Sequence, residues 1–165
     1  MEYSIFVKTI MTMVLIKNDC HYMHLMSKGE DFDKSHNLTQ DYFSTLDYTI
    51  DVISEMALEV QETIPNYSQA LQIISGYQVE NESSYDYPTV IEHLIGRISI
   101  LVVSLKELRN TVTNASMQSK LDDIIRNWEN ELSYKLSRRR PERGININFI
   151  DTGMDKQTVA YRQSN

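Results

Sequence analysis

Four long stretches of this chain carry apolar residues at helical spacing, and very few turn-forming residues interrupt them. The 165 residues include only five Gly and three Pro. This scarcity disfavours a β-sandwich of many short strands and favours long helices joined by few turns. Hydrophobic residues make up 41% and charged residues 24%, which is typical of a folded globular chain. Together these features predict an all-α fold.

The apolar periodicity predicts where the long helices lie. We expect helices over about residues 3–28, 34–63, 89–115 and 117–139, with a short amphipathic helix over 66–76 and a loop over 77–88. The apolar stripe of the first helix consists of Phe6, Ile10, Met13, Cys20 and His24.

Residues that start or stop helices support these boundaries. Gly29 suits the end of the first helix, and Pro65 ends the second. Asp33 or Ser35 suits the start of the second helix, and Ser119–Asp122 resembles a capping box. Four long helices with a short insert predict a four-helix bundle over residues 1–140. We expect residues 141–165 to form a separate basic and polar tail, in which 145–150 suits a short strand or a docking segment.

Cysteine content and apolar run lengths narrow the class of protein. A single cysteine, Cys20, excludes an intramolecular disulfide framework and a cysteine-based zinc finger. The apolar runs 10–16 and 98–105 fall short of the roughly 20 residues that cross a bilayer. Glu2 and Lys8 precede the first run in place of a basic leader. We therefore expect a cytoplasmic protein with no membrane partner.

Charge is distributed unevenly along the chain. The net charge is −7, whereas residues 138–165 hold six Arg and Lys against three Asp and Glu, a local balance of +3. The first 137 residues therefore carry −10. An acidic body with a basic end argues against a chain built throughout to bind polyanions.

One stripe of the second expected helix is rich in carboxylates. Steps of three and four residues connect its members, which are His36, Gln40, Phe43, Asp47, Asp51, Glu55 and Glu59. Like charges one turn apart destabilise a helix by a few tenths of a kcal/mol each, so a bound cation would relieve them. A single histidine is more often a core or capping residue, and a single carboxylate more often a solvated one. Imidazole and carboxylate together suit iron, manganese or zinc.

A single chain cannot close such a site. His36 and Asp51 are fifteen residues apart, which is about 22 Å along a helix. If the helix pairs antiparallel with its copy across a two-fold axis, the histidine end of one chain meets the acidic end of the other. The spacing thus predicts a metal site made by two subunits.

At these residues the sequence resembles the Dps-type mini-ferritins, the DNA-binding proteins from starved cells. The family pattern is His-x4-Gly-x2-Phe-x3-His, followed after 14 residues by Asp-x3-Glu. The chain matches it at every position, with His24, Gly29, Phe32, His36, Asp51 and Glu55. The resemblance extends over about residues 1–137 and implies a ferritin-like four-helix bundle with a short extra helix.

The resemblance also implies an activity and an assembly. Dps proteins are hollow dodecamers that oxidise Fe(II), preferentially with hydrogen peroxide, and store the ferric product. Their two-iron centres lie at the dimer interface. His24 and His36 would be nitrogen ligands from one subunit, and Asp51 and Glu55 oxygen ligands from the other, with Glu55 as the bridging candidate. No organic cofactor is implied.

Two positions depart from the family pattern. Gln40 stands where the family usually has Asp, and its carbonyl oxygen is only a weak ligand. Leu25 stands where the family often has Trp, an aromatic thought to scavenge radicals. Tyr22, Tyr42 and Tyr48 are candidates for that role, although packing explains them equally well. A Dps-like structural or DNA-associated shell with weak or lost ferroxidase activity is therefore the alternative function, and a helical protein that only shares the bundle is a second.

Three further clusters have both a functional and a structural interpretation. Asp122 and Asp123 resemble the family's acidic pore segment, or complement a helix dipole. The arginines at the basic end suit DNA phosphates, or the C-terminus of a helix; they are Arg138, Arg139, Arg140 and Arg143. Cys20 and His21, close to His24, are interpreted as a packing residue and a surface histidine.

Overall fold

The computed structural model describes residues 3–66, 68–69, 72 and 82–140. Its long helices are α1 (Ile5–Met26), α2 (Phe32–Glu59), α4 (Tyr87–Thr111) and α5 (Ala115–Asn130). A π-helical turn, η1 (Glu131–Leu136), and a last helical turn, α6 (Ser137–Arg139), continue the line of α5. The described part of the chain contains no β-strand, only an isolated bridge between Ser27 and Tyr85. The all-α prediction is confirmed.

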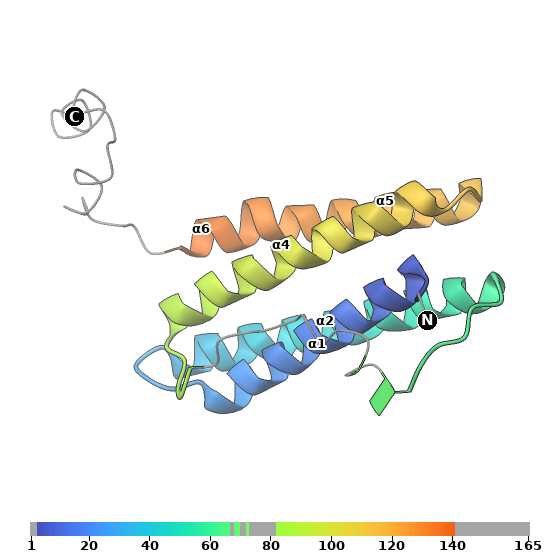
Figure 1. The fold of residues 1–165 in the computed structure, drawn as a ribbon. Coiled ribbons are helices and arrows are strands. Elements are labelled where there is room, and N and C mark those ends of the chain that lie inside the picture. The colour runs from blue at the N-terminus through green and yellow to red at the C-terminus, as the bar shows by residue number, and fades with distance from the viewer. Residues whose placement is uncertain (1–2, 67, 70–71, 73–81, 141–165) are drawn as a thin grey trace, which may run out of the picture.

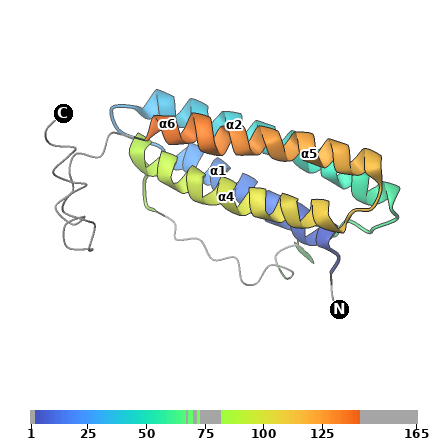
Figure 2. The same cartoon turned by 90° about the horizontal axis from the view of Figure 1, so that it is seen from above.

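The helices form two layers of two (Figure 1). α1 and α2 make one layer, and α4 makes the other with the continuous helix α5–η1–α6. Seen from above, α4 lies over α1, and α5 lies over α2 (Figure 2). This is the four-helix bundle that the sequence predicts.

Local capping explains where three of the helices begin. The side chains of Ser4, Asp86 and Asn114 accept hydrogen bonds from the backbone amides of Val7, Thr89 and Met117. Each cap satisfies an amide that has no partner within its own helix. α4 therefore starts at Tyr87, before the expected residue 89, and α5 starts at Ala115, so the expected capping box at Ser119 is wrong.

The boundaries of α2 also differ from expectation. The helix begins at Phe32, and Asp31 occupies the capping position without a side-chain hydrogen bond. Asp33 and Ser35 thus lie inside the helix, and the buried Ser35 hydroxyl has no partner among the described residues. The helix ends at Glu59, four residues before the expected end. Gln61, with φ +63°, follows that end.

The core between the two layers is apolar, with each of the four long helices contributing. Its fully buried side chains include Ile10, Met13, Ile16, Leu46, Ile53, Met56, Ile91, Leu94, Ile98 and Leu101. Among the described helices, α4 is the only one whose length and apolar composition would be sufficient for crossing a membrane. Eight of its side chains are buried in the bundle, as the central helix of such a core requires.

Two predicted segments lie largely outside the described residues. Of the short helix expected over 66–76, only Ser68, Gln69 and Gln72 are described beyond Asn66, and these three are helical. The tail 141–165, with its expected strand over 145–150 and with Arg143, lies outside the described residues.

Candidate metal centre

His24 and His36 lie against each other at one end of the α1–α2 layer. His24 is in the last turn of α1, and His36 is in the second turn of α2. The turn between the helices contains Gly29, whose φ of +103° is rarely adopted by other residues. This turn reverses the chain so that the two rings stack, with centroids 3.6 Å apart and planes 26° apart.

Reciprocal hydrogen bonds select the tautomer of each neutral ring. Nδ1 of His24 lies 3.0 Å from the carbonyl oxygen of His36, and Nδ1 of His36 lies 3.2 Å from the carbonyl oxygen of His24. A carbonyl only accepts, so each Nδ1 carries a proton and donates it. In a neutral imidazole the other nitrogen, Nε2, then keeps a free lone pair. Both residues are therefore prepared to bind a metal through Nε2, and a backbone group orients each ring.

Aromatic neighbours extend this cluster along the same surface. The ring of Phe32 stacks on His36 with a centroid distance of 4.9 Å. His21, one turn before His24 on α1, contacts Phe43 at 5.0 Å. Leu25, the residue after His24, is 65% exposed and brings no aromatic ring to the cluster.

Asp51 and Glu55 lie farther along α2, one turn apart. Both side chains are exposed, and neither has a hydrogen bond or ion pair with another described residue. Asp47, one turn earlier, is bound to Lys17 at 2.6 Å. Within the described structure, Asp51, Glu55 and the following acid, Glu59, are thus the acidic residues of this stripe that have no partner, and Asp51 and Glu55 lie nearest to the middle of the helix.

The structure brings the histidines together but does not bring the carboxylates to them. Across residues 3–66, 68–69, 72 and 82–140, no group of three or more His, Cys, Asp and Glu side chains in one chain could hold a metal. Two imidazoles alone leave an incomplete ligand set. Any centre built on His24 and His36 therefore needs further ligands.

Gln40 lies one turn after His36 and is exposed. Its amide nitrogen donates to the hydroxyl of Ser44 at 3.1 Å, which leaves the carbonyl oxygen without a partner in the described structure. A neutral oxygen donor is therefore present there in place of a carboxylate.

The predicted pore acids, Asp122 and Asp123, both have cationic partners. Nε and Nη2 of Arg109, on α4, bind the two carboxylate oxygens of Asp122 at 2.8 and 3.1 Å. The hydrogen bonds from this guanidinium lower the pKa of Asp122. Asp123 is bound to Arg126 at 3.1 Å. Both carboxylates are thus part of ion pairs in the isolated chain.

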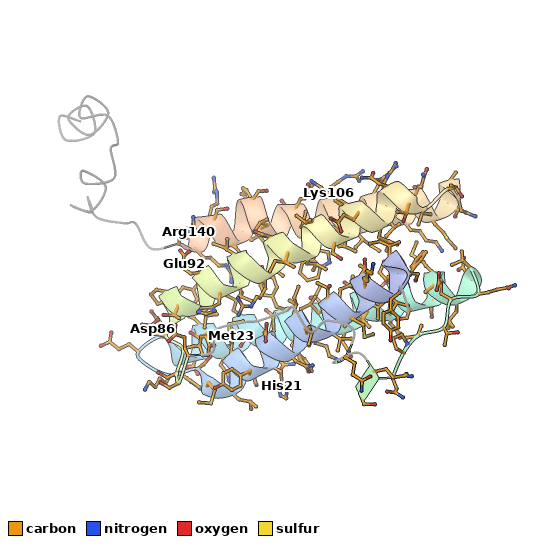
Figure 3. All side chains as sticks on the ribbon, viewed as in Figure 1. His21, Met23, Asp86, Glu92, Lys106 and Arg140 are labelled. Atoms are coloured by element: carbon orange, nitrogen blue, oxygen red, sulfur yellow. The ribbon has the colours of Figure 1, made fainter. Side chains whose placement is uncertain are left out.

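The basic end of the last helix also has structural contacts. Arg140 makes two hydrogen bonds of 2.8 Å to the carboxylate of Glu92, at the start of α4 (Figure 3). The guanidinium of Arg138 lies 4.6 Å from the centre of the Tyr134 ring. Arg138 and Arg139 are exposed. These three arginines are therefore at the surface, with Arg140 held by an acidic partner.

Sequence reasoning missed one buried polar contact. The hydroxyl of Tyr42 donates to the carboxylate of Glu131 at 3.0 Å, and its ring lies 6.1 Å from that of Trp128. Burial, together with the charge of Glu131, raises the pKa of Tyr42. The π-helical turn, which sequence periodicity does not reveal, begins at Glu131.

The other tyrosines and the cysteine occupy simpler positions. Tyr22 donates to the backbone carbonyl of Glu82, and Tyr48 is 71% exposed. Cys20 is fully buried, and burial raises its thiol pKa to about 12. Cys20 is thus an unreactive packing residue, as expected.

The structure resembles several solved proteins, although the sequence relationship is distant. No protein-family model matches the chain, and no curated protein sequence matches it. A CAIP from Helicobacter cinaedi superposes with a TM-score of 0.75 and 15% identity, covering 83% of this chain and 97% of its own. The antigen TpF1 from Treponema pallidum gives 0.74 and 16%, covering 82% and 88%. The fold is a ferritin-like helical bundle.

A third structure points to the same fold. A Dps mutant from Listeria innocua superposes with a TM-score of 0.59 and 14% identity, covering 82% of this chain and 83% of its own. At such identities the likeness concerns the arrangement of helices alone. The ferritin-like bundle predicted from the sequence is confirmed.

Proposed function

We propose that this chain is a Dps-like protein that oxidises Fe(II) and stores the ferric product in the cytoplasm. The observation that carries the proposal is the stacked pair of His24 and His36, whose Nδ1 atoms are hydrogen-bonded and whose Nε2 atoms have no partner among the described residues. Imidazole nitrogen and carboxylate oxygen together suit iron.

The missing oxygen ligands come from a second copy of the chain. Antiparallel pairing of two α2 helices brings the unpaired carboxylates Asp51 and Glu55 of one copy to the histidines of the other, and a two-fold axis generates two such centres. Exposed apolar side chains favour this surface as a contact. Phe32, which is 40% exposed, and Leu58, which is 59% exposed, lie on the same stripe of α2 as His36 and Asp51.

The chemistry of the centre follows from its paired ions. Two Fe(II) ions supply one electron each, so hydrogen peroxide and two protons give two Fe(III) and two water molecules. No hydroxyl radical is released, because both electrons reach the oxidant together. Protection against peroxide is therefore the physiological role that we propose, within a dodecameric shell.

Fe(II) oxidation by the intact assembly tests this function. Anaerobic Fe(II) loading followed by peroxide should give a ferric absorbance rise, and His36→Ala or Glu55→Ala should reduce its initial rate at least tenfold, as loss of a metal-site group commonly does. His93→Gln is the matched control, because His93 is on α4 and its described ring contact is with Tyr85 rather than with His24 or His36. Equal rates in all variants would contradict an iron centre at these residues.

Gln40 favours a second candidate function, a Dps-like shell with little iron chemistry. Its neutral amide replaces a carboxylate next to His36, which weakens attraction for a cation. The same experiment separates the two functions, since a shell of this kind has a native mass near 230 kDa, about twelve times 19.2 kDa, but no histidine-dependent oxidation. DNA remains a proposed partner of the arginines at the basic end.

A further inference from the structure

His21 is an exposed histidine beside the proposed centre. It lies on the side of α1 that faces away from α4 and α5 (Figure 3). Its ring centroid is 6.2 Å from that of His24 and 5.0 Å from that of Phe43. The ring thus continues the row formed by His24 and His36 along the outer face of the α1–α2 layer.

No other described group occupies the nitrogens of His21. Both ring nitrogens lack a hydrogen bond to any residue that the structure describes. The next cation on this face, Lys17, is bound to Asp47 at 2.6 Å and lies over the Phe43 ring at 5.4 Å. Its charge is therefore partly compensated, so a metal ion can approach His21 with little repulsion.

We propose that His21 is a third imidazole ligand of the centre, binding a divalent transition-metal ion together with Nε2 of His24. Residues three apart on a helix are neighbours on one face, close enough for both side chains to bind one ion. Gln40 lies between His36 and Phe43 in the α2 sequence, and its carbonyl oxygen, which has no partner in the described structure, is a further neutral oxygen donor on this helix. The inference rests on the proposed function, because the imidazoles of His21 and His24 need the carboxylates of a second copy to complete the ligand set of their shared ion.

This arrangement gives the site a nitrogen-rich side and an acidic side. Imidazoles suit iron and zinc, whereas sites of carboxylate, carbonyl and water alone suit magnesium, calcium and manganese. A third imidazole therefore favours the binding of iron over that of the more abundant hard cations.

Co(II) binding tests the role of His21 without relying on oxidation. Co(II) is titrated into the full-length protein, and the visible absorption of bound Co(II) monitors the titration. The proteins compared are wild type, His21→Ala, His24→Ala and the control His93→Gln. We expect His21→Ala to lower Co(II) affinity about tenfold and to change the absorption spectrum. His24→Ala should lower the Co(II) affinity further, and the affinity of His93→Gln should equal that of wild type. Because His21 is exposed, its substitution should leave the fold intact, and circular dichroism verifies that each variant is folded.

The outcomes separate this inference from the proposed function. Wild-type affinity and spectrum in His21→Ala, with weakened binding in His24→Ala, would overturn the role of His21 and leave the proposed function in place. Wild-type affinity in both variants would overturn both. A tenfold loss in His21→Ala with loss in His24→Ala supports both.

Discussion

His24 and His36 each donate a hydrogen bond from Nδ1 to the backbone carbonyl of the other, so the end of α1 and the start of α2 fix each other's rings. The loop between them is short, and Gly29 provides its reversal. The geometry of the proposed ligands therefore depends on the turn as well as on the rings.

Gly29→Ala should destabilise the protein and weaken metal binding together. A side chain at φ +103° is strained, at a cost of about 1–2 kcal/mol. Urea unfolding followed by circular dichroism, at one protein concentration for all variants, measures this cost.

Gly96→Ala is the control for that substitution. Gly96 lies within α4, where an added Cβ meets no atom within 4 Å. Alanine there should stabilise the protein by about 0.5–1 kcal/mol. Equal stability changes for the two substitutions would contradict the role assigned to the turn.

Tyr42→Phe should lower the free energy of unfolding by about 1–2 kcal/mol, because the half-buried Glu131 loses a hydrogen bond. Glu131 keeps its ion pair with Lys135, so the loss is limited. Tyr134→Phe, on the exposed side of the π-helical turn, should change little. Urea midpoints of the three proteins compare these effects.

The same tyrosine should give a signature at alkaline pH. The pKa of Tyr42 is raised in the folded state, so the unfolded chain loses its proton first, near the ordinary value of about 10. The stabilising contribution is complete below pH 10 and is lost as the pH rises beyond it. Wild type should therefore lose stability more steeply than Tyr42→Phe between pH 9.5 and about 11; parallel pH curves would contradict the buried hydrogen bond.

The thiol of Cys20 should resist modification in the folded protein. It is fully buried with a pKa near 12, so the reactive thiolate is scarce at pH 8. A disulfide reagent should react with less than one thiol per chain over minutes under native conditions, and with one after denaturation. Immediate native reaction would contradict the packing described for α1.

The proposed DNA binding should depend on Arg138 and Arg139 rather than on the tail that follows. Residues 141–165 hold three basic and three acidic residues, so the excess positive charge of this end belongs to residues 138–140. Arg140 is already bound to Glu92. In gel shifts, the double variant Arg138→Gln, Arg139→Gln should lose more affinity than a chain ending at Arg140, with a weaker salt dependence. The reverse order would assign the contact to the tail.

The presence of the long helices was predictable from the sequence, because apolar residues repeat in it at helical spacing. Ile10, Leu46 and Leu94 are examples of such residues, and all three are buried in the core. The ends of the helices were less predictable from the sequence. Several polar residues compete for each cap. Asn114 rather than Ser119 caps α5, because Asn114 lies directly after the end of α4 and accepts a hydrogen bond from the amide of Met117. The π-helical turn at Glu131 leaves no periodic signal.

The site was predictable in its residue types but not in its contacts. The spacing of His36 and Asp51 along one helix already showed that the two residues of one chain cannot bind the same metal ion. The structure adds that Asp51 and Glu55 have no partner among the described residues. His21 was predicted to be a surface residue and is exposed, but nothing in the sequence around it reveals the contact of its ring with Phe43. The ion pairs of Arg109 with Asp122 and of Arg140 with Glu92 were likewise not predictable, because the partners in each pair lie on different helices.

A complementation experiment tests the central claim, that histidines of one subunit act with carboxylates of another. His36→Ala and Glu55→Ala are co-expressed in equal amounts, and Fe(II) oxidation is compared with that of each variant alone. Half of randomly paired dimers are mixed, and one of the two centres in each mixed dimer is intact, so about a quarter of wild-type activity should return. Activity no higher than that of the single variants, with mixed assemblies verified by native mass spectrometry, would contradict a shared centre.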